Sequence, residues 1–247
     1  MLPLSDPELR RRSFPVVNVC LIALSATVFT YELLLSDRDL ELFLLRFAII
    51  PNELAHGASY STIQIGRQSF DITTPYSEWL TPFTALFLHG GWLHFLGNML
   101  FLWVFGDNVE DRLGKLPYLL FYLGTGLAAA WLQIATDNRS EVPNIGASGA
   151  IAGVLGAYLV LFPLSRVRTL VLFGFFVTTA LVPAALLIGL WIALQFFSGV
   201  ASLGAQTGGG VAYWAHIGGF GAGLALMALY KLVVLRQPLW PRRPPAP

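Results

Sequence analysis

The sequence predicts an all-α polytopic membrane protein, and two observations carry this prediction. Of the 247 residues, 55% are hydrophobic and only 12% are charged, and the mean hydropathy is +0.66. Soluble domains carry about 25% charged residues. The second observation is six apolar runs of about 20 residues each, the length at which an α-helix crosses roughly 30 Å of hydrocarbon. We therefore expect a six-transmembrane-helix bundle.

The six runs define the expected domain organisation. They cover approximately residues 15–35, 83–105, 116–135, 146–164, 169–197 and 211–235. The first run follows three arginines, as in a signal peptide, but it is long and no convincing small-residue cleavage site ends it, so we expect a retained signal anchor. The loop after it should carry short structure at the membrane interface. We divide the chain into an N-terminal tail (1–14), a membrane domain (15–236) and a Pro-rich tail (237–247).

The distribution of Lys and Arg predicts that both termini are cytoplasmic. With the N-terminus inside, eleven Lys or Arg residues fall in the inner segments, and four fall in the outer ones: Arg38, Arg46, Arg67 and Arg139. Cytoplasmic loops of membrane proteins carry such an excess. We expect a bacterial inner membrane as the location. The net charge of +1 favours no nucleic-acid partner, and the single cysteine, Cys20, excludes an intrachain disulfide.

Polar residues inside the runs fall toward the starts of the second, fourth and sixth helices. They are His94, Asn98, Ser148 and His216, and the predicted orientation brings them to the same leaflet. Ser148 alone would more often be a helix cap or a small packing residue. His216, or the pair of His94 and Asn98, could simply bond a neighbouring helix. Because polar groups in lipid are costly, their coincidence favours a functional site.

The fourth helix has an unusual length. If it runs from Ser148 to just before Pro163, it is about 22 Å long and therefore shorter than the hydrocarbon core. Its start must then lie below the surface, where a water-filled cavity would tolerate non-helical backbone. Glycines four residues apart on this helix (Gly149, Gly153) and on the sixth (Gly219, Gly223) predict close packing of the two helices.

Elimination narrows the chemistry to a serine with a histidine. All fourteen Asp and Glu residues lie at or before Glu141, and none lies in the middle of an apolar run, which excludes a pair of facing membrane aspartates. There is no His-Glu-x-x-His sequence, and the four histidines have no Cys or acidic partners in the apolar runs, so we expect no metal. The charge-poor interior also disfavours a channel or carrier.

These residues resemble the rhomboid intramembrane serine proteases. The resemblance covers roughly residues 80–227 and rests on FLHGGWLHFLGN, FGDNVEDRLG, GASG and AHIGG, in this order. It implies that Ser148 is the nucleophile, that His216 is the general base and acid, and that the protein has no cofactor. It further implies that His94, Asn98 and the Ser148 backbone N–H form the oxyanion hole, and that transmembrane proteins are the substrates. Glu110 and Arg112 match a structural motif of the family.

Two departures and one rival remain. Some members place a tyrosine on the imidazole four residues after the serine, whereas this chain has Ala152 there, so the ring must be steadied otherwise. The Trp-Arg pair of some first loops is missing. The Gly-rich connection at 199–212 is a candidate cap over the site, with a connection without a gating role as the alternative. The rival function is a catalytically silent relative that binds membrane proteins. The oligomeric state stays open.

Overall fold

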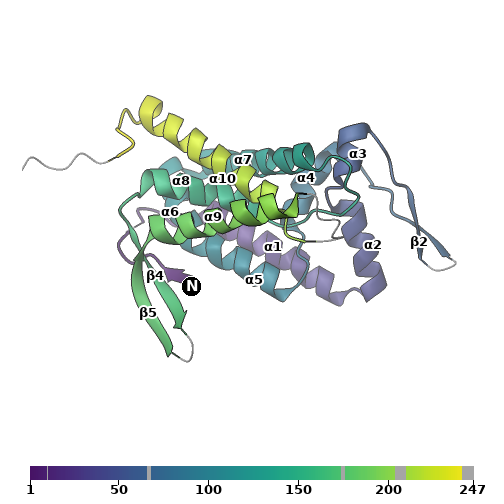
Figure 1. Ribbon diagram of the computed structural model, residues 1–247, viewed down its shortest axis with the longest axis horizontal. Coiled ribbons are helices and arrows are strands. Elements are labelled where there is room, and N and C mark those ends of the chain that lie inside the picture. Colours follow the sequence, from purple (N-terminus) through teal and green to yellow (C-terminus); the bar gives the residue numbers. More distant parts are fainter. Residues whose placement is uncertain (10, 66–67, 174–175, 204–209, 241–247) are drawn as a thin grey trace, which may run out of the picture.

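The computed structural model describes residues 1–9, 11–65, 68–173, 176–203 and 210–240 (Figure 1). Part of the Gly-rich connection considered as a cap (204–209) and part of the Pro-rich tail (241–247) lie outside these residues, as does Arg10. The fold is mostly helical, as expected. The helices that make up the bundle are α1 (Val16–Leu34), α5 (Trp92–Phe101), α7 (Lys115–Thr136), α8 (Ser148–Leu161), α9 (Ala184–Ser202) and α10 (Tyr213–Leu229).

Short elements extend or connect these helices. The π-helical turn η3 (Leu102–Gly106) continues α5 into α6 (Asp107–Leu113), and a second π-helical turn, η4 (Tyr230–Val234), extends α10. The loop between α1 and α5 contains α2 (Asp37–Phe47), α3 (Pro51–His56), β2 (Thr62–Ile65), β3 (Gln68–Asp71), η1 (Glu78–Leu80), α4 (Thr81–Thr84) and η2 (Ala85–Phe87). The expectation of short structure in this loop is therefore confirmed.

Within the described residues, four helices are long and apolar enough to cross a membrane. They are α1, α7, α9 and the continuous helix formed by α10 and η4. The segments Glu78–Phe87 and Trp92–Leu113 are separated by a bend of 83°. If the two segments count as one broken helix, they add a fifth span. The chain is thus an integral membrane protein. The predicted count of six is not confirmed, since α8 has only 14 residues.

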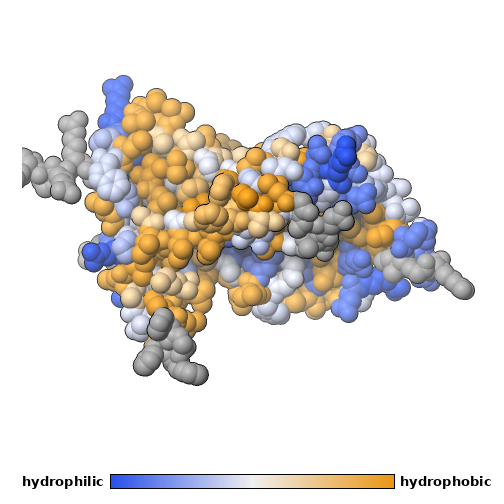
Figure 2. All heavy atoms as spheres, in the orientation of Figure 1, coloured by the Kyte–Doolittle hydropathy of each residue, from blue (hydrophilic) through white to orange (hydrophobic). Residues whose placement is uncertain are grey.

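The apolar surface agrees with a membrane environment. Figure 2 shows hydrophobic residues gathered over the half of the molecule that contains α9 and the end of α10, and hydrophilic residues toward α2 and α3. On α9, the side chains of Leu186, Leu190 and Leu194 are each more than half exposed. In a bilayer these leucines would face lipid, where exposure of an apolar side chain carries no hydrophobic cost.

Two predicted elements were wrong. The run at 169–197 does not begin as a helix, because β4 (Arg166–Phe173) and β5 (Phe176–Pro183) form an antiparallel pair before α9 starts. An apolar run of strand length cannot be told from a helix by hydropathy, and the β-branched residues here favour a strand. With β1 (Leu2–Ser5) paired to β4, the fold is not all-α. The second helix, expected from residue 83, starts only at Trp92 after the bend.

The N-terminal segment, expected as a tail, is docked on one end of the bundle. Besides the pairing of β1 with β4, the Asp6 carboxylate accepts hydrogen bonds from Tyr158 Oη at 2.6 Å and from Asn108 Nδ2 at 3.1 Å. The backbone N–H of Ser13 donates to Asp111 at 2.9 Å. The segment therefore connects the β4–β5 hairpin to the C-terminal half of α8.

A buried polar cluster ties α1 to the centre of the bundle. The carboxylate of Glu110, which is only 1% exposed, accepts the backbone N–H of Asn18 at 2.7 Å and pairs with Lys115 at 2.7 Å. Helix starts leave N–H groups without partners, and Glu110 satisfies two of them in α1. The Arg112 guanidinium lies 5.3 Å from the ring centre of Phe162, at the end of α8. Glu110 therefore binds the start of α1, and Arg112 contacts the residue that follows α8.

Candidate active site

Helices α8 and α10 pack with their backbones in direct contact. A methyl group added at Gly219 would overlap the carbonyl oxygen of Gly149, and one added at Gly223 would overlap that of Gly153. Only glycine permits this approach, as the spacing of the glycines predicts. The contact sets the distance between the first turn of α8 and the first turn of α10.

Ser148 and His216 meet at this contact. Ser148 is the first residue of α8, and His216 lies in the first turn of α10 and is 7% exposed. The Ser148 hydroxyl lies 2.7 Å from His216 Nε2. In this geometry the hydroxyl can donate its proton to the imidazole when the oxygen becomes a nucleophile.

The other side of the imidazole is held by α9, a helix that no sequence motif assigned to the site. Gln195 Oε1 lies 2.7 Å from His216 Nδ1, and the Trp191 ring lies 5.6 Å from the imidazole, centre to centre, at an interplanar angle of 39°. Within the described part of the chain, Ser148 and Gln195 are the hydrogen-bond partners of this ring. A lone amide in an apolar run was the signal that could have revealed Gln195.

His94 points its Nε2 atom toward the loop that leads into α8. The backbone N–H of Gly90 donates to His94 Nδ1 at 3.3 Å, so the ring proton resides on Nε2 when the imidazole is neutral. A methyl group at Gly146 would come within 2.5 Å of Nε2. Gly146 also has a φ of +115°, which side chains disfavour, so both its backbone and its neighbour require glycine.

Asn98 provides a second donor beside the same loop. Its side chain is buried, and among the described residues Nδ2 has no hydrogen-bond partner. The position of a methyl group at Gly146 would be 3.6 Å from this atom. A buried amide without an acceptor is costly, because desolvation is not compensated. His94 and Asn98 therefore present two N–H donors to the backbone just before Ser148.

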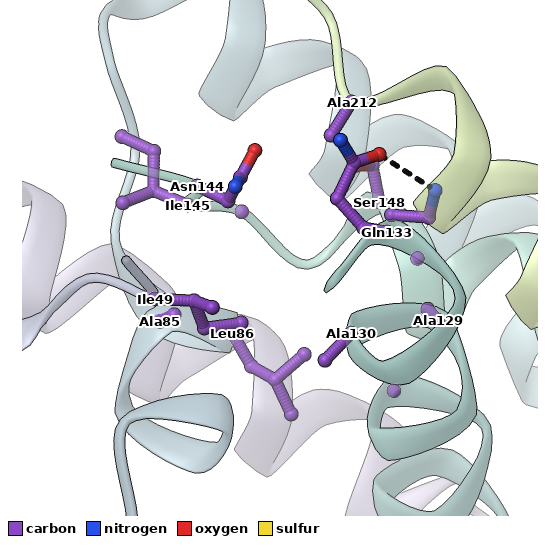
Figure 3. Close-up of a pocket in the computed structure, with 14 residues that line it drawn as sticks. Ile49, Ala85, Leu86, Ala129, Ala130, Gln133, Asn144, Ile145, Ser148 and Ala212 are labelled. Atoms are coloured by element: carbon purple, nitrogen blue, oxygen red, sulfur yellow. Dashed lines mark hydrogen bonds between the residues drawn. The ribbon is translucent and has the colours of Figure 1, made fainter. Parts of the chain in front are cut away.

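A small cavity reaches Ser148 from the side of α7 (Figure 3). It encloses about 40 Å³, and Gln133, Gly146, Ser148 and Ala212 are among its lining residues. Gln133 accepts the backbone N–H of Ala215 at 3.2 Å, which holds α7 against the start of α10. One water molecule needs at least about 10–15 Å³ of such volume, so water fits beside the hydroxyl.

The comparisons with known proteins show the family of this chain. A family model described as the rhomboid domain matches residues 76–232, and this chain belongs to the rhomboid family. The family includes intramembrane serine proteases. All four candidate residues, His94, Asn98, Ser148 and His216, lie inside the matched region.

Curated relatives share moderate identity over part of the chain. RHOMBOID-like protein 5 of Arabidopsis thaliana is 31% identical over 116 residues, which are 47% of this chain and 37% of the relative. Putative rhomboid protease YdcA of Bacillus subtilis is 34% identical over 90 residues, 36% of this chain and 45% of the relative. Rhomboid protease GluP of Bacillus subtilis is 43% identical over 82 residues, which are 33% of this chain and 16% of the relative. The chain thus spans less than half the length of each relative.

Proposed function

We propose that this chain is an intramembrane serine endopeptidase that cleaves transmembrane proteins in or near their membrane segments. The observation that carries the proposal is the 2.7 Å hydrogen bond between Ser148 Oγ and His216 Nε2. It stands inside a rhomboid domain and beside a cavity with room for water. In this proposal the chain crosses the membrane six times, with α8 as a short span and both termini in the cytoplasm of a bacterial cell.

The first half of the reaction forms an acyl-enzyme. Ser148 Oγ attacks the carbonyl carbon of the scissile peptide while His216 Nε2 takes the hydroxyl proton. Negative charge develops on the carbonyl oxygen, and the Ser148 backbone N–H, His94 Nε2–H and Asn98 Nδ2–H donate to it. The N–H groups of a helix start have no partner within the helix, so the Ser148 N–H can serve this role. The protonated His216 then gives its proton to the leaving amine.

The second half releases the acylated fragment. A water molecule from the cavity beside Ser148 attacks the acyl carbon, and His216 again takes the proton. The proton then returns to Ser148 Oγ as the acyl bond breaks. The reaction needs no cofactor, because the chain supplies the nucleophile, the base and the oxyanion donors.

Cleavage in liposomes tests the proposal. The wild type should cut a model transmembrane substrate, whereas Ser148→Ala and His216→Ala should each lower kcat by at least about 10³-fold. The double variant should lose little more than either single variant, because the two groups act as a unit. A catalytically silent relative would give no cleavage by the wild type, and undiminished cleavage by Ser148→Ala would exclude the proposed nucleophile.

A further inference from the structure

We infer that Gln195 is a positioning residue that holds His216 in the tautomer able to take the Ser148 proton. The inference rests on the proposed function and adds a residue of α9, a helix that carries none of the groups named in the proposed reaction. In a Ser-His-Asp site, the aspartate carboxylate orients the histidine ring. Among the described residues, no carboxylate contacts His216. The neutral Gln195 amide lies where such a group would act.

The two nitrogens of the His216 ring must play different parts. A neutral imidazole carries one proton, and only the nitrogen without it can accept a proton from serine. Ser148 Oγ faces Nε2, so the proton must be on Nδ1 for the reaction to start. Gln195 Oε1 accepts hydrogen bonds only, and it lies 2.7 Å from Nδ1. A proton on Nδ1 satisfies both contacts, whereas a proton on Nε2 leaves Gln195 Oε1 facing a bare nitrogen.

The setting of Gln195 supports this role. It is the only residue of α9 with a side-chain carbonyl, and its sequence neighbours Leu194 and Phe196 are exposed apolar residues. An amide among lipid-facing residues is costly, so it is expected to turn inward to a partner. The lipid offers no such partner, whereas the imidazole does.

Trp191 restricts a different degree of freedom. It precedes Gln195 by one helical turn and therefore lies on the same face of α9. Its ring is within the distance range of aromatic pairs from His216. Trp191 thus limits the tilt of the imidazole at a site where Ala152 offers no aromatic ring, while Gln195 fixes the location of the proton.

Nitrogen-15 NMR of histidine-labelled protein in lipid, at a pH where the imidazole is neutral, tests the inference directly. The chain has only four histidines, and His216→Ala identifies the resonances of interest. The wild type should show Nδ1 protonated and Nε2 bare. Gln195→Leu should give a mixture of tautomers, whereas Gln195→Glu, which keeps the acceptor oxygen, and Trp191→Leu, which removes no acceptor, should keep the wild-type state.

Kinetics supply the second arm. Gln195→Leu should lower kcat by about 10- to 100-fold with little change in KM, the range found when an orienting partner of a histidine is removed at metal sites. Gln195→Glu should restore most of this loss, and Leu194→Ala, an exposed neighbour on the same helix, should behave as the wild type. A merely structural Gln195 would lower the folded fraction equally in both Gln195 variants.

Three outcomes would overturn the inference: a proton on Nε2 in the wild type, an unchanged tautomer in Gln195→Leu, or equal kcat losses in the Leu and Glu variants. The NMR arm needs no activity and can be repeated in Ser148→Ala. If the wild type does not cleave any substrate, the proposed function fails, and the tautomer still decides the role of Gln195. If Gln195→Leu does not fold, the wild-type tautomer and Gln195→Met decide it.

Discussion

The two helices that flank His216, α8 and α9, are held in opposite ways. In α8, ten of 14 residues are buried, whereas in α9 only four of 19 are buried. The first carries Ser148 and is fixed by backbone contact with α10; the second carries Gln195 and exposes much of its surface. In the proposed mechanism, the reacting serine therefore lies on a mostly buried helix, while the orientation of the imidazole depends on a helix with much exposed surface. Because of this difference, substitutions in the two helices and around them should affect different quantities: the rate of cleavage, the stability of the fold or the orientation of the imidazole.

After the loss of Ser148 or His216, the largest effect should come from Asn98, which lies on α5 beside the loop that leads into α8. If its Nδ2–H donates to the oxyanion, the hydrogen bond strengthens as charge develops, and its loss acts on the rate. Asn98→Ala should lower kcat by about 10²-fold or more and leave KM nearly unchanged. The measurement is steady-state cleavage in liposomes, with the folded fraction determined on the same samples, and His94→Ala as a companion.

The alternative for Asn98 is a purely structural role. In that case the substitution should cost about 0.6–2 kcal/mol of stability, the range for interhelical hydrogen bonds in membranes, and activity should follow the folded fraction. A destabilised Asn98→Ala protein with near-normal kcat per folded molecule would remove Asn98 from the oxyanion hole.

The next largest effect compares the packing of the α8–α10 contact with that of α9. Gly223→Ala places a methyl group against the backbone of Gly153, so α8 and α10 must separate, and we expect a loss of about 2–3 kcal/mol in the free energy of unfolding. Gly189→Ala on α9 is the matched control, because no atom lies within 4 Å of the new methyl group. It should change stability by less than about 1 kcal/mol. Unfolding in mixed detergent measures both; similar losses would contradict the contrast between the helices.

The smallest effect concerns the N-terminal segment, which contacts α8 and pairs with the β4–β5 hairpin that precedes α9. Burial raises the pKa of Asp6 from 3.8 to about 6; the charge of Asp107 adds to this rise, while the Tyr158 hydroxyl and Arg11 oppose it. Because the docked carboxyl has the higher pKa, docking is favoured below about pH 4 and weakens as the pH rises through 6. Hydrogen exchange of residues 1–9, corrected for intrinsic rates, should be about 10-fold faster at pH 7.5 than at pH 5.

The control for this prediction is Asp6→Asn, which cannot ionise. Exchange in this variant should no longer differ between the two pH values, and the segment should stay docked at pH 7.5. A wild-type segment that exchanges more slowly at pH 7.5, or an equal pH dependence in Asp6→Asn, would show that Asp6 does not control docking.

The contrast between α8 and α9 also explains what the sequence could predict. The approach of α8 to α10 follows from glycines at a fixed spacing, whereas the roles of Ser148 and His216 came from the resemblance to the rhomboid proteases. Gln195 has no such pattern, and its role depends on a rotation of α9 that hydropathy does not specify. The β4–β5 hairpin was missed because hydropathy does not distinguish an apolar strand from an apolar helix. The docking of the N-terminus could not be predicted because it depends on a contact between Asp6 and Tyr158, which are 152 positions apart.

The central claim, that Ser148 is a nucleophile activated by His216, is tested most directly by covalent labelling. A fluorophosphonate probe, which reacts with activated serines, should modify the wild-type protein in lipid, and mass spectrometry should place the adduct on Ser148. His216→Ala should react at least about 10²-fold more slowly, since the base is gone, and Ser148→Ala should not react. Equal labelling of wild type and Ser148→Ala, or an adduct on another serine, would contradict the account.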